Sequence, residues 1–157
     1  YYRTWKAGER QPRGYLDCGT ASAYHDKRLP YVAAAHFDRW PQACLRLQGD
    51  HIHISFFDGS LRPYLSSLLT EDSPGMLFLT AATYRTFRGR SRAFSVREDY
   101  RFAIDGTAHF QKEHFQDGIV CDDTLSVDVR HHWEPYPEFG DYQSLLALRW
   151  VEVLKAI

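Results

Sequence analysis

Apolar and polar side chains alternate along several stretches of this chain, which is the pattern of a β-strand with one buried face. The clearest stretch is 51–57, in which Ile52 and Ile54 lie on the same face. Residues 43–48 also alternate, and the turn signal Gly49-Asp50 separates the two stretches. We therefore predict a β-hairpin over this part of the chain.

The C-terminal half repeats this pattern three times. Alternating stretches cover 94–104, 108–115 and 119–129, and Asp-Gly pairs at Asp105-Gly106 and Asp117-Gly118 separate them. Asp-Gly between alternating stretches is a strong hairpin signal, because both residues tolerate the backbone conformation of a tight turn. The sequence therefore predicts an antiparallel meander here.

Two stretches show the spacing of a helix instead. Between Ser60 and Thr70 the apolar residues recur three and four positions apart, and Pro63 would fall in the first turn. Asp141 can cap a final helix that runs to about Lys155. The apolar run 76–80 predicts a central strand. We predict an α+β fold, a mainly antiparallel sheet (hairpin plus C-terminal meander) with about two helices packed on one face.

Length and composition indicate one domain over residues 1–157, with 1–28 as a loop-rich N-terminal segment. The three cysteines are widely spaced, so we expect reduced thiols in a reducing compartment rather than disulfides. No apolar run approaches the roughly 18–20 residues that cross a bilayer. We expect a cytoplasmic protein that needs no membrane and no cofactor.

Negative charge is concentrated between residues 104 and 142, which hold 9 acidic and 2 basic residues among several aromatic ones. Aromatic anchors within a charged rim are typical of protein interfaces, and carboxylates attract a basic partner. The same residues could also be ordinary solvated surface. Under the interface interpretation, the candidate partner-binding residues are Asp117, Asp122, Asp123, Asp128, Trp133, Glu134, Tyr136 and Glu138.

The C-terminal third resembles immunity proteins of bacterial polymorphic-toxin systems. The resemblance lies in the turn 104–106, the meander up to Val129, and the run 133–140 (WEPYPEFG) that leads into the predicted helix. It implies a single-domain cytoplasmic inhibitor, without catalytic residues or cofactor, that binds a cognate toxin. Toxins that cut nucleic acids carry basic active-site surfaces, which an acidic inhibitor can cover. We favour this function.

A metal-dependent enzyme or small-molecule binder is the first alternative. His51 and His53 would project from the same face of a strand, and with Asp58 they resemble the first metal-binding motif of cupins. No second cupin motif follows, and two histidines on the polar face of a hairpin explain the pattern equally well. The chain also lacks the serine-hydrolase and nucleotide-binding motifs. We therefore predict that it is not an enzyme.

A nucleic-acid-associated domain is the second alternative. The stretch 84–101 interleaves six arginines with four aromatic residues, which suits phosphate contacts and base stacking. The arginines could instead pair with the acidic segment that follows them. The overall net charge of −1 favours this pairing and argues against nucleic-acid binding.

Overall fold

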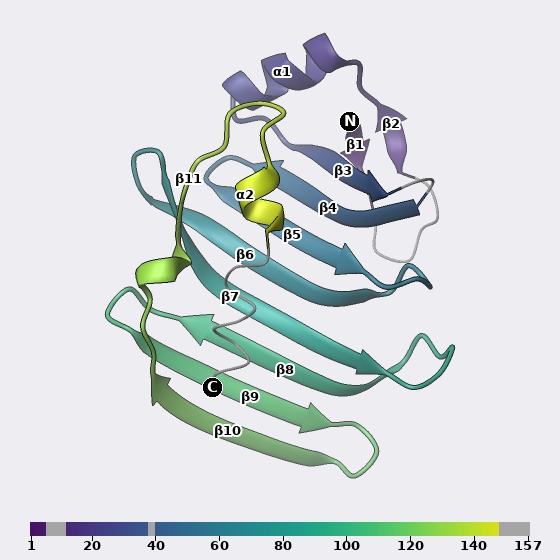
Figure 1. Ribbon diagram of the computed structural model, residues 1–157, viewed down its shortest axis with the longest axis vertical. Helices are drawn as coiled ribbons and strands as arrows, with labels where there is room; N and C mark the ends of the chain where they lie inside the picture. The colour runs from purple at the N-terminus through teal and green to yellow at the C-terminus, as the bar shows by residue number, and fades with distance from the viewer. Residues whose placement is uncertain (6–11, 38–39, 148–157) are drawn as a thin grey trace.

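The computed structural model describes residues 1–5, 12–37 and 40–147, and most of its regular structure belongs to one antiparallel sheet (Figure 1). The strands are β1 (Tyr2–Thr4), β2 (Arg13–Tyr15), β3 (Tyr31–Phe37), β4 (Trp40–Gln48), β5 (His51–Phe57), β6 (Pro63–Ser73), β7 (Met76–Phe87), β8 (Phe94–Phe102), β9 (Thr107–His114), β10 (Ile119–Ser126) and β11 (Trp133–Pro135). The helical elements are α1 (Cys18–Asp26), α2 (Gln143–Leu146) and the 3-10 turn η1 (Arg130–His132).

The order of the strands follows the chain. Within the described residues the sheet has 11 strands in the order β10-β9-β8-β7-β6-β5-β4-β3-β1-β2, and β11 pairs with β7 outside this path. Every strand from β3 to β10 is antiparallel to the next one in sequence. The predicted hairpin, β4 with β5, and the predicted meander, β8 to β10, are both confirmed.

The main hydrophobic core lies on one face of the sheet, and a smaller buried cluster of Trp5, Val32 and Phe57 is separate from it. Ile52 and Ile54 are fully buried, whereas His51 and His53 on the opposite face of β5 remain exposed. Leu45 on β4 lies directly opposite Ile54, so neighbouring strands direct their apolar side chains to the same side. The period-two pattern of the sequence therefore determines which face of the sheet is buried.

The predicted α+β class is wrong, because the protein is mostly antiparallel sheet and two helices do not pack together on one face. The segment 60–70, predicted as a helix, forms most of strand β6. Leu65 and Leu69 are four residues apart, which places them on one side of a helix but also on one face of a strand, and both are buried. Because β6 pairs with β5 on one edge and β7 on the other, the sheet satisfies its backbone groups and overrides the helical spacing.

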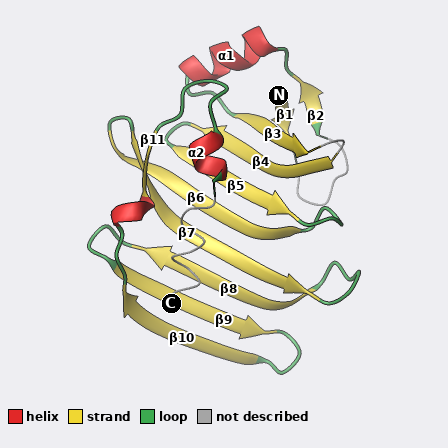
Figure 2. Ribbon diagram, in the orientation of Figure 1, coloured by secondary structure: helices red, strands yellow, loops and turns green. Residues whose placement is uncertain are grey.

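The two helices occupy different places (Figure 2). Helix α1 lies beside β3 at one end of the sheet, and Asp17 caps it by accepting a hydrogen bond from the N–H of Thr20. Residues 1–28, expected to be mostly loop, thus contain two short strands and α1. Helix α2 lies in front of the sheet, with Leu145 in the core. The predicted helix up to Lys155 is described only as far as α2, and residues 148–157 lie outside the described part.

Strand β7 divides the sheet into two regions. Along one edge β7 pairs with β6, but its other edge is shared, because 76–78 pair with β11 and 81–87 pair with β8. We call β3 to β7 the packed half and β8 to β10 the outer lobe. Among the described residues, no helix has the length and apolar character required to cross a membrane.

Candidate functional site

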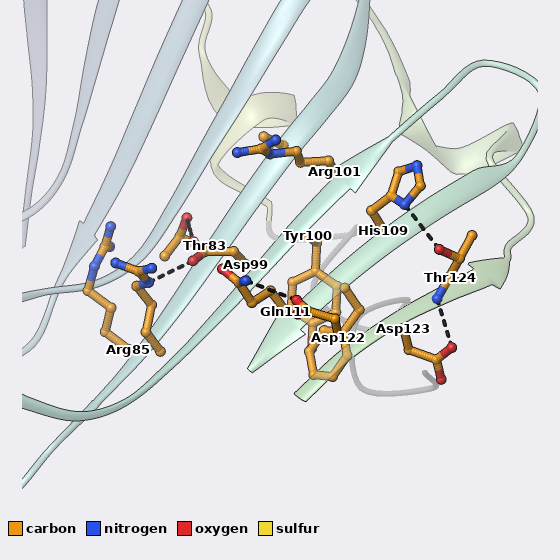
Figure 3. Close-up of a pocket in the computed structure, with 13 residues that line it drawn as sticks. Thr83, Arg85, Asp99, Tyr100, Arg101, His109, Gln111, Asp122, Asp123 and Thr124 are labelled. Carbon is orange, nitrogen blue, oxygen red and sulfur yellow. Dashed lines mark hydrogen bonds and ion pairs between the residues drawn. The ribbon is translucent and has the colours of Figure 1, made fainter. Parts of the chain in front are cut away.

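The outer lobe presents a polar face on the side of the sheet away from the core. Residues that lie opposite one another in the strand register form three rows across β7 to β10. Most residues of these rows line a depression of about 1100 Å³, and every residue of its lining comes from these four strands (Figure 3). The three rows are Arg85, Arg97 and Glu113; Thr83, Asp99, Gln111 and Asp122; and Arg101, His109 and Thr124.

The first row brings like charges together, and carboxylates offset them. Arg85 and Arg97 lie directly opposite each other on β7 and β8. The guanidinium of Arg97 contacts Asp99 at 2.7 Å and Glu113 at 3.2 Å, and the hydroxyl of Thr83 donates to Asp99 at 2.7 Å. Partial burial lowers the pKa of Arg85, and the nearby charge of Asp99 counteracts this effect. Arg97 thus pairs with one carboxylate of its own stretch and with Glu113 of the acidic segment that follows.

Side-chain hydrogen bonds join β10 to β9 across the same face. Gln111 donates to Asp122 at 2.9 Å, and a ring nitrogen of His109 lies 3.1 Å from the hydroxyl oxygen of Thr124. Arg101 lies opposite His109 in the register of β8 with β9, and it is exposed. The depression therefore offers hydrogen-bond donors and acceptors together with side chains of both charges. This combination suits contact with the polar surface of another macromolecule.

Strand β10 forms the outermost edge of the lobe. All of its residues except Leu125 are exposed, and no described strand pairs with its outer side. Ile119 and Val120 are each 51% exposed, and Phe115 in the preceding turn is 43% exposed. Apolar side chains at this level of exposure on an unpaired edge are available for contact with another molecule.

The structure divides the eight predicted partner-binding residues between separate places. Asp117 lies in the turn before β10, whereas Asp122 and Asp123 lie in the middle of β10 itself. Asp128 follows β10 and is paired with Arg130 at 2.5 Å. Hydrogen bonds from Arg130 hold the pKa of the Asp128 carboxyl well below its usual range. Its charge is therefore largely offset within the chain.

The predicted aromatic anchors face inward. The ring of Trp133 on β11 packs against Phe78, with 4.9 Å between ring centroids, and the guanidinium of Arg28 lies 3.5 Å from the centre of the Tyr136 ring. Glu134 is half-buried on β11, and Glu138 is exposed in the loop before α2. The expected single surface of carboxylates and rings is not formed, because the rings attach residues 127–142 to the sheet.

The alternative metal site is not assembled. His51 and His53 do share a face of β5, but the carboxylate of Asp58 accepts hydrogen bonds from the N–H of Ser60 and forms an ion pair with Arg62 at 2.6 Å. Although His53 reaches solvent, partial desolvation by its neighbours lowers its pKa, and the charges of nearby arginines on β4 and β7 lower it further. Among the described residues, no three potential metal ligands come together.

No family model, no curated protein sequence and no solved structure matches this chain. The arrangement of its own residues therefore has to indicate the function. Sequence reasoning missed Arg101 and His109 as parts of one surface, because they are eight positions apart and only the register of β8 with β9 places them side by side. The alternation within 94–104 and 108–115 was the available signal.

Proposed function

We propose that this chain is a protein-binding inhibitor, specifically a cytoplasmic immunity protein that covers the active site of a cognate bacterial toxin domain. The observation that carries the proposal is the outer lobe, whose polar depression adjoins an exposed acidic edge strand. Asp122 belongs to both, since it lines the depression and lies on β10. A partner that docks on this edge can therefore contact the depression as well.

The charge of the edge favours a basic partner. Residues 113–129 contain five carboxylates and no lysine or arginine. Of the five, Glu113 and Asp128 have cationic partners in the chain, whereas Asp117 and Asp123 are exposed carboxylates with no ion pair in the described part of the chain. Such a surface accelerates association with a positively charged protein and holds it through complementary contacts. A toxin that acts on nucleic acid presents that kind of surface.

The test is to co-produce the chain in bacteria with the C-terminal domain of a secreted protein encoded next to its gene. We expect the chain to restore growth and to elute with that domain as one complex. Reversal of charge in the double variant D122K/D123K should abolish both effects. The matched control is D72K near the C-terminal end of β6, an exposed carboxylate outside the outer lobe, and it should preserve both.

Two results contradict this proposal. One is that the wild-type chain neither relieves growth inhibition nor forms a complex with the toxin domain. The other is that D72K and D122K/D123K weaken the complex equally, which would mean that the outer lobe has no special part in binding.

A further inference from the structure

The hydrogen bonds around β9 show which of its backbone groups face each neighbouring strand. The N–H of Phe115 donates to the carbonyl of Ser95 at 3.0 Å, and the carbonyl of Thr107 accepts from Ala103 at 2.8 Å. Both contacts join odd-numbered residues of the β9 region to β8. Because successive residues of a strand direct their backbone groups to opposite edges, the even-numbered residues of β9 face β10.

The strand register then fixes the orientation of β10. Its residues opposite the even positions of β9 are Ile119, Cys121, Asp123 and Leu125, so these form the hydrogen-bonded pairs. The bond from the N–H of Val127 to the carbonyl of Gly106, at 2.9 Å, continues the same alternation. The N–H and C=O groups of the intervening residues therefore point outward, and these residues are Val120, Asp122, Thr124 and Ser126.

The contacts of Thr124 and Asp122 agree with this orientation. The N–H of Thr124 donates to the Asp123 carboxylate at 2.7 Å instead of to β9. The side-chain bond between Gln111 and Asp122 occurs at a position that the alternation makes non-hydrogen-bonded, where opposite side chains approach most closely. Three N–H groups and four C=O groups along β10 thus face outward and lack a described partner strand.

We propose that an extended basic segment of the partner protein adds to β10 as a further strand of the sheet. This inference rests on the proposed function, since it specifies how the inhibitor and its partner join. Main-chain hydrogen bonds to an exposed edge supply affinity in this mode of recognition, and alternate side chains supply specificity. The outward-facing backbone of β10 provides such an edge.

The two faces of β10 define the pattern of the segment that fits. Asp122 and Thr124 lie on the polar face, beside the depression, whereas Cys121 and Leu125 lie on the opposite face. A segment with basic residues at alternate positions and apolar residues between them places its cations beside Asp122 and its apolar side chains beside Leu125. Asp123 adds a carboxylate to the second face.

A second copy of this chain does not fit the edge as well. If the β10 strands of two copies paired antiparallel about the middle of the strand, Asp122 and Asp123 of one copy would lie against the same residues of the other. Like charges directly opposite each other destabilise a sheet, and charged side chains on an edge strand oppose self-association. The charges of this edge thus select a basic partner.

The probe for the test is a synthetic peptide as long as β10, 8 residues, in which lysine and valine alternate. Amide exchange followed by NMR on the full chain should show that the peptide slows exchange at Val120, Asp122 and Ser126. The matched peptide with glutamate in place of lysine should not. V120P removes one outward N–H and should weaken binding roughly tenfold, whereas V120A keeps that N–H and should bind as the wild type does.

Methylation of the peptide backbone gives the same test without altering the protein. N-methyl groups on the peptide residues whose N–H groups point toward β10 should abolish protection. N-methyl groups on the alternate residues, whose N–H groups point away from β10, should leave it intact. The inference is overturned if the peptide protects none of these amides, or if the lysine and glutamate peptides bind equally. It is also overturned if both methylated peptides bind alike, or if the chain instead pairs with itself through β10. Failure of the growth assay with intact peptide binding would reject the immunity function alone.

Discussion

The packed half and the outer lobe belong to the same sheet, but their side chains are arranged differently. In the packed half, β5 places Ile52 and Ile54 in the core, and β4 and β6 add leucines beside them. In the outer lobe, Tyr100 and Phe102 are still buried on β8, whereas β10 contributes no buried residue. Burial therefore decreases strand by strand from β7 to the outer edge.

This difference shows that sheet hydrogen bonding can extend beyond the core. The outer strands are held by their neighbours, by the ion pairs of Arg97 and by the ion pair between Lys112 and Glu98 at 2.6 Å. Exposed ion pairs contribute little to stability, whereas burial of a leucine contributes several-fold more. The outer lobe is therefore free to vary its surface without loss of the fold.

The largest expected difference between the two regions is the loss of stability when a large side chain is shortened. Leu45 is 1% exposed, and L45A should destabilise the protein by about 2–5 kcal/mol, because the lost contacts are only partly recovered by relaxation. V120A on the outer edge should change stability by less than about 0.5 kcal/mol. Urea unfolding monitored by fluorescence measures both. Equal losses would contradict the division into two regions.

The junction between the regions should respond to pH through His132. This side chain is 1% exposed, lies against Phe78 of β7 and Phe102 of β8, and has no hydrogen-bond partner among the described residues. Burial lowers its pKa, and Asp128 partly opposes the shift. The unfolded chain therefore binds a proton more readily, so stability should fall as the pH drops below about 6.5.

A single histidine contributes at most about 1.4 kcal/mol per pH unit to this loss. H132L should flatten the pH dependence by that amount and should be at least as stable as the wild type at pH 8, because no imidazole is left buried without partners. Urea unfolding at pH 8 and at pH 5.5 measures the difference. His25 and His53, whose pKa values desolvation also lowers, remain in the variant and should keep part of the slope. An unchanged slope would exclude His132 as a source.

A matched pair of charge deletions should give a smaller contrast. Glu71 in the packed half accepts hydrogen bonds from Arg28 at 2.9 Å and from the N–H of Gly75 at 2.6 Å, and E71Q should cost about 1–2 kcal/mol. In the outer lobe, E113Q removes one of the two carboxylates at Arg97 and should cost less than about 1 kcal/mol. Thermal unfolding compares the two, and the reverse order would contradict the argument.

The smallest expected effect on folding is at Asp122. This exposed residue accepts a hydrogen bond from Gln111 and forms no ion pair in the described part of the chain, so D122N should leave stability within about 0.5 kcal/mol of the wild type. The same change should weaken the complex with the co-produced toxin domain, because it removes a charge from the edge. Calorimetric titration of the purified pair measures the affinity. A stable variant with unchanged affinity would separate Asp122 from the binding surface.

The sequence was informative wherever one strand face is buried and the other is exposed. The stretch 51–57 was predicted with the bounds that β5 has, because polar and apolar residues alternate from His51 to Phe56. The segment 60–70 was misjudged, since spacing by four is compatible with both helix and strand and only the pairing of β6 with two neighbours decides between them. Asp117, Asp122 and Asp123 could be grouped from sequence because they are close along the chain.

By itself the sequence determined the side of each alternating strand that is buried, the position of the Asp-Gly turns and the acidic character of residues 113–129. Only the tertiary structure decided that Trp133 and Tyr136 turn inward and that Arg97, Asp99 and His109 share one polar face. The physical reason is the separation along the chain over which each effect acts. Alternation and turn chemistry act between residues a few positions apart, whereas a surface built from four strands depends on their register.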